Sequence, residues 1–190
     1  MNPRGTLVVI SAPSGGGKNA IIRELLKLFP GSTRFVTTTT RAPREGERAG
    51  IDYHFVSEQN FKQMIEQGAF IEYNFYAGNY YGSEKTKLEE TLNTSSLVFA
   101  PLDINGKKQL DALGFGHIAL FLLPEDLSIL KDRILHRGGL TNDEIAARMQ
   151  LADDEIAEAK KYDLALVNPD GNMHEAVAQI QQFLQKRLTI

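Results

Sequence analysis

The sequence of 190 residues contains no cysteine and no tryptophan, and neither sign of charge dominates it. Without cysteine the chain can form no disulfide, thiolate nucleophile, cysteine-based zinc site or iron–sulfur cluster. Its 21 lysines and arginines against 24 aspartates and glutamates give a formal net charge of −3. This balance argues against a general binder of nucleic acid or of membrane surfaces. Small anionic ligands stay open, because they need only a local positive site.

Long apolar runs are also missing. The run 7–10 is too brief for the core of a signal peptide, and the run 118–123 is far below the roughly 20 residues that span a bilayer. We therefore expect a cytoplasmic protein without a targeting segment or a membrane partner. Because a domain typically has about 150 residues, we expect one domain over 1–190. The sequence leaves open whether the protein is a monomer or a homo-oligomer.

Short apolar runs alternate with helical spacing along much of the chain. The runs that predict buried strands are 6–12, 96–102, 117–123 and 163–168. The helical patterns are clearest at 20–28 and 173–188. This alternation predicts an α/β fold with a central parallel sheet flanked by helices.

Two segments interrupt the alternation. Residues 34–83 are rich in Thr, Tyr, Phe and Arg and contain short alternating runs, which predict a mixed β insertion with one helix near 58–67. The alternating runs are 35–39, 53–56 and 71–76. Residues 137–148 include Gly138-Gly139, and we interpret them as a mobile lid that leads into a helix ending at Lys161. The predicted core is what remains, about 1–33, 84–136 and 149–190.

A glycine-rich turn joins the first predicted strand to the first predicted helix, and it reads Ala12-Pro13-Ser14-Gly15-Gly16-Gly17-Lys18-Asn19. Glycines let backbone N–H groups turn toward phosphate oxygens. The helix N-terminus adds partial positive charge, and Lys18 can reach the terminal phosphates. The turn departs from G-x-x-x-x-G-K-[ST] at both ends, with Ala12 and Asn19. We interpret it as a phosphate-binding P-loop, the alternative being an ordinary glycine-rich turn.

A second group of motifs lies in the predicted insertion. Residues 37–47 read TTTTRAPREGE, followed by GIDYHF at 50–55, FIEY at 70–73 and GNYYGS at 78–83. Their order and spacing closely resemble those of guanylate kinases, a family of nucleoside monophosphate kinases. The P-loop, A-P-S-G-x-G-K, is similar to the form found in bacterial members. The resemblance runs from Gly5 to about Asn168. It implies a P-loop kinase fold, with a GMP-binding insertion and a lid, that transfers the γ-phosphate of ATP to GMP or dGMP with Mg²⁺.

On the acceptor side, the resemblance assigns the GMP phosphate to arginines and phenols, which suit a dianion. These residues are Arg41, Arg44, Tyr53 and Tyr81. For the guanine base it implies a carboxylate and hydroxyls, from Glu72, Ser83 and Thr37. Asp103 corresponds to an acidic residue near both the 2-amino group and the magnesium ion.

On the donor side, the resemblance implies that residues 12–19 and Asn168 bind ATP. The catalytic residues that it implies are Lys18, Arg41, Arg133, Arg137 and Arg148. The metal would meet Asn19 and, through water, Asp103. Phosphoryl transfer needs in-line positioning and charge neutralisation, and arginines on a closing lid supply both.

Two departures from the family pattern lie near the expected metal. Asn19 replaces the usual Ser or Thr. Pro101 stands where many members have the first Asp of D-I-D-x-Q-G, and Asn105 replaces the Gln of that motif. We expect these changes to affect Mg²⁺ affinity and the catalytic rate more than GMP binding.

Two alternative functions stay open. The first is a guanylate-kinase-like binding module with weakened catalysis, which Asn19 favours and the retained Lys18, Arg137 and Arg148 disfavour. The second is a P-loop kinase for a sugar phosphate. We disfavour it because Glu72, Ser83 and the two tyrosines would then have no guanine to bind.

Overall fold

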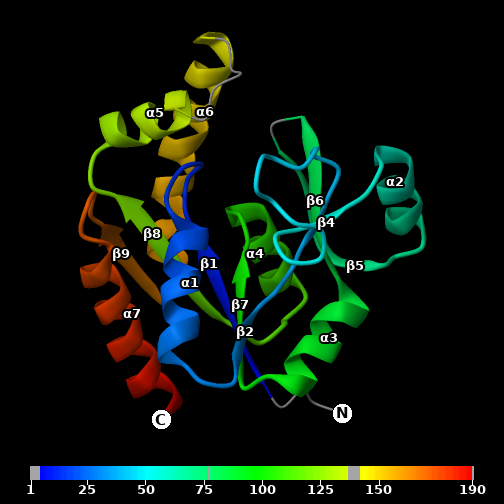
Figure 1. Cartoon of the computed structure of the whole chain (residues 1–190), viewed down its shortest axis with the longest axis horizontal. Coiled ribbons are helices and arrows are strands. Elements are labelled where there is room, and N and C mark those ends of the chain that lie inside the picture. Colours follow the sequence, from blue (N-terminus) through cyan, green and yellow to red (C-terminus); the bar gives the residue numbers. More distant parts are fainter. Residues whose placement is uncertain (1–4, 77, 137–141, 190) are drawn as a thin grey trace. The chain divides into compact units, whose positions relative to one another are not determined.

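The computed structural model describes residues 5–76, 78–136 and 142–189, and these divide into two compact units (Figure 1). The first unit contains the described residues up to Val8 together with Gly31–His117. The second unit contains Val9–Pro30 and the described residues from Ile118 onward. The larger of two sheets has five strands in the order β2-β7-β1-β8-β9, with β1 (Thr6–Ser11) in the middle.

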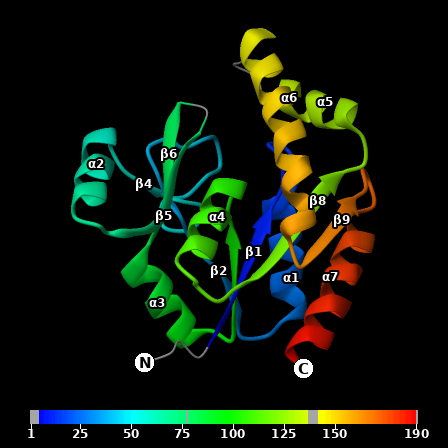
Figure 2. The same ribbon diagram turned by 180° about the vertical axis from the view of Figure 1, so that it is seen from behind.

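In the second unit, β8 and β9 form a parallel pair next to helices. Strand β8 (Ile118–Pro124) aligns with β9 (Leu164–Asn168) from Leu120↔Leu164 to Pro124↔Asn168. The helices of this unit are α1 (Lys18–Leu28), α5 (Leu127–His136), α6 (Asn142–Ala157), the short 3₁₀ helix η1 (Glu158–Lys161) and α7 (Met173–Leu188). Helix α7 packs against α1 and β9, and α5 packs against α6 (Figure 2).

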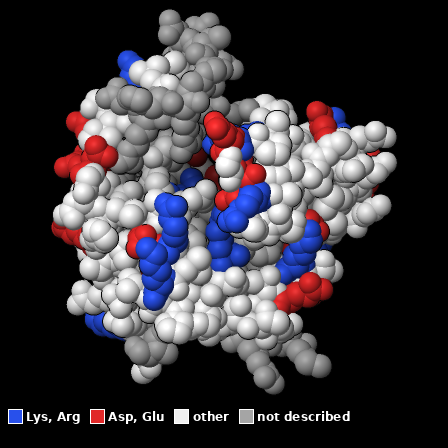
Figure 3. Space-filling model, viewed as in Figure 1, with Lys and Arg blue, Asp and Glu red and all other residues white. Residues whose placement is uncertain are grey.

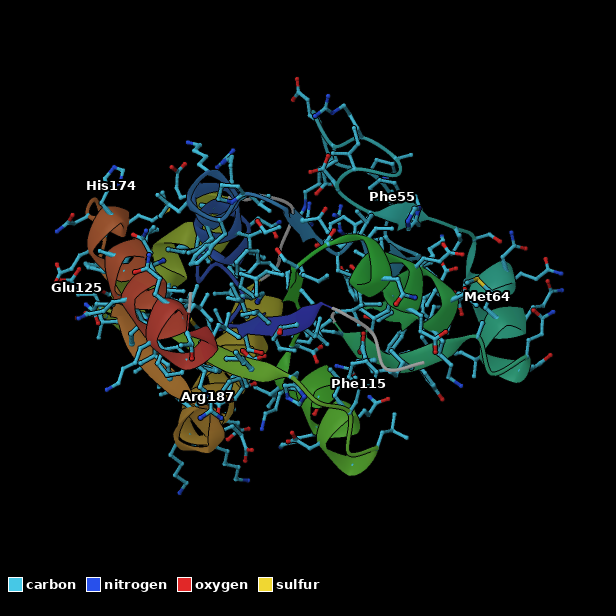
Figure 4. The ribbon with its side chains drawn as sticks, turned by 90° about the horizontal axis from the view of Figure 1, so that it is seen from below. Phe55, Met64, Phe115, Glu125, His174 and Arg187 are labelled. Atoms are coloured by element: carbon cyan, nitrogen blue, oxygen red, sulfur yellow. The ribbon has the colours of Figure 1, made fainter. Side chains whose placement is uncertain are left out.

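The ends of β8 and β9 are tied by a carboxylate. Beyond β8, Glu125 accepts a hydrogen bond at 3.0 Å from the backbone N–H of Asp170, which follows β9. Glu125 is labelled in Figure 4. At the start of the same strands, the Asp163 carboxylate accepts from the Ala119 N–H at 2.8 Å. Both contacts hold the parallel pair in register.

In the first unit, β2 (Ser32–Arg34) lies parallel to β7 (Leu97–Pro101). Helix α3 (Lys85–Thr94) precedes β7 in the chain, and helix α4 (Ile104–Ala112) follows it. A smaller sheet has the order β4-β3-β6-β5. Its strands are β3 (Thr38–Thr39), β4 (His54–Phe55), β5 (Phe70–Tyr76) and β6 (Asn79–Glu84). The β3–β4 pair is parallel, whereas β6 is antiparallel to both β3 and β5. The sheet is therefore mixed.

Helix α2 (Glu58–Glu66) packs on this sheet through aromatic rings. The side chain of Ser57, the N-cap residue of α2, accepts a hydrogen bond from the Asn60 N–H. Serine is a preferred residue at this position of a helix. The Phe61 ring is fully buried and stacks on Phe70 at 4.4 Å and on Tyr80 at 5.2 Å between centroids. Phe55 and Met64 mark the sheet and this helix in Figure 4.

The structure confirms the predicted α/β class and the central parallel sheet flanked by helices. All four predicted buried strands are present, as β1, β7, β8 and β9, and α7 has the predicted bounds. Two strands were not predicted, β2 and β6. Of the alternating run 35–39 only Thr38–Thr39 is a strand. Residues 142–148 of the predicted lid begin helix α6 and residues 137–141 lie outside the described part, so the lid stays a prediction.

The aromatic packing around β6 yields a stability prediction. A Cβ on Gly82 would lie 2.8 Å from Cδ1 of Phe70 and 3.0 Å from Cζ of Phe61. We expect Gly82→Ala to lower the free energy of unfolding by about 1–3 kcal/mol, because both rings must shift. Gly116→Ala is the matched control, since no heavy atom lies within 4 Å of its Cβ. Urea unfolding measures both variants, and equal losses would show that the ring packing is not the constraint.

Candidate functional site

The turn after β1, in the second unit, is shaped by glycines. The Gly16 N–H donates to the Pro13 carbonyl at 2.9 Å, and a Cβ on Gly16 would lie only 2.6 Å from that of Ala12. Gly17 is the N-cap of α1 and has a left-handed φ of 86°. Within the described residues, no side chain caps α1, and its first turn carries no acidic residue. The N-terminal N–H groups of α1 therefore suit an anion.

Two side chains of the predicted donor set contact this turn directly. The Lys18 ammonium donates to the Ala12 carbonyl at 2.6 Å. The Asn168 side-chain amide, at the end of β9, donates to the Gly16 carbonyl at 3.1 Å, and Asn168 is only 6% exposed. Its Oδ1 is buried without a hydrogen-bond partner among the described residues. The structure thus brings Asn168 to the glycine-rich turn, while Asn19 lies exposed on the first turn of α1.

The other predicted donor residues are arginines further along the chain. Arg133 belongs to α5 and Arg148 to α6, and Arg137 lies outside the described residues. The two helices pack through Leu130 and Ile145, with Ala152 in the same buried cluster. The roles of the three arginines stay predictions.

All eight predicted acceptor residues belong to the first unit. Arg41 and Tyr53 are in contact, with the guanidinium 5.3 Å from the ring centroid, a distance at which cation–π attraction operates. The Tyr81 ring lies edge-on to Tyr53 at 6.2 Å. The structure thus gathers one guanidinium and two phenols, the groups that bind a dianionic phosphate.

Glu47 orients the predicted arginines of this cluster. Its two carboxylate oxygens each accept a hydrogen bond from Nη2 of Arg41 at 2.8 Å, and Oε2 also accepts from the Arg44 N–H at 2.9 Å. Partial burial would raise the pKa of Glu47, but the Arg44 N–H and the Arg41 guanidinium outweigh it and lower this pKa. Glu47 is therefore ionised, and it holds the turn that carries the exposed Arg44.

Tyr53 keeps its phenolic proton. Burial raises the pKa of its hydroxyl and the neighbouring Tyr81 adds to the rise, against a lowering by Arg34 and Arg41. A protonated phenol can donate a hydrogen bond to an anion.

The threonine run beside this cluster is occupied mainly with pairing β3 to its neighbours. The Thr38 hydroxyl donates to Glu84 at 2.5 Å, and the Thr39 hydroxyl donates to the Tyr80 carbonyl at 2.8 Å. The Thr40 hydroxyl accepts from the Tyr80 N–H at 2.9 Å. Thr37, the predicted base-binding residue of the run, is 4% exposed.

Glu72, on β5, is a carboxylate buried to 4% exposure, and it is enclosed from two sides. The Ser83 hydroxyl, on β6, donates to its Oε1 at 2.5 Å. A register shift between Phe70 and Glu72 places Glu72 directly opposite Ser83, as bulges near binding sites often do. Burial raises the pKa of Glu72 to about 7, and the nearby Asp103 charge adds to the rise, whereas the Ser83 hydrogen bonds oppose it.

The first turn of α4 forms the other side of this enclosure. A Cβ on Gly106 would lie 2.6 Å from Oε2 of Glu72, so only glycine lets the helix approach the carboxylate. Asp103 is the N-cap of α4, and its Oδ1 accepts from the N–H groups of Asn105 and Gly106. Its Oδ2 accepts from the Asn74 amide at 2.7 Å. These contacts fix Asp103 close enough to Glu72 to affect its charge.

Several residues that shape the site were not predicted to have a role. They are Arg34, Glu47, Asn74 and Gly106; Asn168 was predicted as a residue that binds ATP, and only its contact with Gly16 was not predicted. Only Glu47 and Gly106 lie inside motifs visible in the sequence. Asn74 could have been found from its position, because it is two residues from Glu72 and side chains at i and i+2 of a strand share a face.

On the face drawn in Figure 3, basic and acidic side chains are interspersed. Among the described residues, no group of three or more His, Asp or Glu side chains is placed to hold a metal ion. In the same part of the chain, no helix is both long enough and apolar enough to cross a membrane.

Comparison with known proteins supports a common fold and family. A family model described as guanylate kinase matches residues 4–187. The guanylate kinase of Shewanella sp. strain MR-7 is 40% identical over 191 residues, covering 100% of this chain and 91% of its own. That of Clostridium perfringens strain SM101 is 38% identical over 183 residues, covering 96% and 84%. The crystal structure of guanylate kinase from Anaplasma phagocytophilum matches with a TM-score of 0.77 and 25% identity, covering 98% and 88%.

The buried carboxylate generates a prediction about stability and pH. The pKa of Glu72 is raised from 4.5 to about 7 in the folded chain, so the folded state holds a proton that the unfolded state loses in this range. Stability therefore falls as pH rises from about 4.5 to 7, by up to about 3 kcal/mol. We expect Glu72→Gln, which cannot ionise, to unfold at higher urea than the parent at pH 8, with little difference at pH 4.5. An equal difference at both pH values would contradict a raised pKa.

Proposed function

The chain belongs to the guanylate kinase family, and we propose that it transfers the γ-phosphate of ATP to GMP, and to dGMP, giving ADP and the nucleoside diphosphate. The observation that carries the proposal is the buried Glu72 carboxylate, bound by Ser83, in the same unit as the Arg41–Tyr53–Tyr81 cluster. A base reader and a phosphate cluster in one unit are what a purine monophosphate requires.

The chemistry of guanine matches this carboxylate. Guanine carries two donors on one edge, N1–H and the 2-amino group, whereas adenine offers no such pair. An ionised Glu72 accepts both, and Ser83 holds one of its oxygens in place. We propose that Thr37 and Asp103 complete the base site. Because buried polar groups left unpaired are costly, such a site rejects bases that lack the donors.

The acceptor phosphate would bind to Arg41, Arg44, Tyr53 and Tyr81. Glu47 already fixes the Arg41 guanidinium and the turn of Arg44, so little side-chain entropy is lost when the phosphate arrives. The phenols add hydrogen bonds without adding charge. Recognition is thus divided between a preorganised cationic cluster and a separate base reader.

ATP would bind at the turn of residues 12–19. The N–H groups at the start of α1 suit its phosphates, and Lys18, now on the Ala12 carbonyl, supplies positive charge. We propose that Asn168 supports this turn through its hydrogen bond to Gly16 and lies beside the bound ATP.

The reaction needs no general base, because the attacking phosphate oxygen of GMP is already an anion. That oxygen forms a bond to the γ-phosphorus while the bond from this phosphorus to the β,γ-bridging oxygen breaks, and ADP leaves with the electron pair. Charge builds on the leaving oxygen and spreads over the transferred group. We propose that Lys18, Arg41, Arg133, Arg137 and Arg148 neutralise it and hold the reactants in line.

We further propose that Mg²⁺ accompanies ATP. Magnesium keeps several water ligands and is commonly bound by one or two protein oxygens plus substrate phosphates. Asn19 carries an amide oxygen and Asp103 a carboxylate, which are oxygen ligands of the kind that Mg²⁺ takes, and we propose that Asn19 contacts the ion directly and Asp103 through water. When bound, Mg²⁺ would screen the phosphate charges. We propose that the protein acts in the cytoplasm and that its reaction involves neither nucleic acid nor a membrane.

The two alternative functions are less well supported. A kinase for a sugar phosphate would leave the Glu72–Ser83 pair without a ligand. A binding module without catalysis would not need the glycine-rich turn with its Lys18 contact.

The proposal is tested by following ADP release with GMP, dGMP, AMP, CMP and UMP in turn, with and without Mg²⁺. We expect saturable, Mg²⁺-dependent turnover with the two guanine nucleotides only. Glu72→Gln should reduce the preference for GMP over AMP by at least about 100-fold, because the amide NH₂ faces the guanine donors. Tight GMP binding without turnover at high Mg²⁺ would instead establish the binding module, and an unchanged preference in Glu72→Gln would remove Glu72 as the base reader.

A further inference from the structure

Arg34, on β2, reaches away from its strand to a loop that carries a phosphate ligand of the proposed site. Its Nη2 donates to the Asp52 carbonyl at 2.9 Å and its Nη1 to the Ile51 carbonyl at 3.2 Å. The guanidinium also lies 5.8 Å from the ring centroid of Tyr53. One side chain therefore contacts three consecutive residues, 51–53.

Arg34 belongs to a strand, β2, whose backbone is held by pairing with β7. Arg34 is in register with Phe99 of β7, and the next residue, Phe35, donates its backbone N–H to the Phe99 carbonyl at 2.9 Å. The Arg34 side chain is only 15% exposed. A largely buried side chain on a paired strand has little freedom to move.

The loop itself is turned by local contacts. The Asp52 carboxylate accepts from the Arg48 N–H at 2.8 Å, and the Gly50 N–H donates to the Tyr53 carbonyl at 2.9 Å. These bonds shape residues 48–53 but lie within the loop. The guanidinium of Arg34 adds an attachment to a strand of the larger sheet.

Tyr53 thus lies near two arginines whose guanidinium groups have different hydrogen-bond partners. Arg41 lies 5.3 Å from the ring centroid, and Glu47 holds its guanidinium. Arg34 is held by backbone carbonyls, and its nearest contact with the Asp52 carboxylate is 3.7 Å. Arg41 is paired with the carboxylate of Glu47, whereas Arg34 donates to backbone carbonyls of the loop.

We propose that Arg34 is a positioning residue of the acceptor site, which anchors residues 51–53 to β2 and so sets where the Tyr53 hydroxyl meets the phosphate of GMP. This inference rests on the proposed function and extends it to a residue outside every motif of the sequence. The two carbonyls call for a planar fork of donors, which lysine lacks. The planar geometry of the arginine guanidinium, and not its charge alone, therefore holds the loop.

The test compares Arg34→Met and Arg34→Lys with Arg48→Met in the full chain. Arg48 is exposed in the same loop, so its variant removes one charge but leaves the fork. We expect Arg34→Met to weaken GMP binding about tenfold by calorimetry and to raise KM for GMP, with kcat and KM for ATP changed less than about twofold. Arg34→Lys should lose nearly as much, and Arg48→Met almost nothing.

A double-mutant cycle with Tyr53→Phe separates positioning from general structural damage. If Arg34 acts through the Tyr53 hydroxyl, Arg34→Met should cost less than about twofold once that hydroxyl is gone. If Arg34→Met does not fold, Arg34→Lys takes its place in the cycle. Additive losses, full rescue by lysine, or an Arg34→Met variant that matches Arg48→Met would each overturn the inference while leaving the proposed function intact. A parent chain that binds no GMP would overturn both.

Discussion

A buried carboxylate, that of Glu72, constrains the first unit from several directions. It needs the Ser83 hydroxyl at 2.5 Å on one oxygen and a glycine at position 106 beside the other. Among the described residues the structure gives it no cationic partner, and burial with the nearby Asp103 raises its pKa to about 7. An incompletely compensated buried acid is costly to keep in a fold. We propose that a ligand supplies the missing donors, and the bulge in β5 and the close approach of α4 enclose the carboxylate.

The sequence predicts the larger sheet well and the smaller one in part. Strands such as β8 are apolar on both faces, so a short continuous run of apolar residues identifies them in the sequence. Strand β6 reads Asn-Tyr-Tyr-Gly-Ser-Glu, which carries no apolar alternation; it pairs with β3 and β5, and Gly82 leaves room for the rings of Phe61 and Phe70. Strand β2 has only three residues and depends on pairing with β7. The partners of β2 in β7 and of β6 in β3 are distant in sequence, which local patterns do not contain, whereas β6 also pairs with the neighbouring β5.

Much the same division holds for the site. Motif order was enough to select Arg41, Tyr53, Glu72 and the glycine-rich turn, because each is a residue type that the proposed ligand chemistry requires. It could not select Arg34, whose effect on Tyr53 comes through the backbone of a loop seventeen and more residues away. Such roles depend on which strands meet, and only the folded chain shows that.

The central claim, that ionised Glu72 reads guanine, is tested most directly by counting protons released when GMP binds at pH 7. Calorimetry in buffers of different ionisation enthalpy gives this number for the parent and for Glu72→Gln. With a pKa of about 7, Glu72 is about half protonated before binding and must ionise to accept the guanine donors. The account predicts that the parent releases about half a proton more than Glu72→Gln, in which the phosphate contribution remains. Equal release from the two proteins would contradict it.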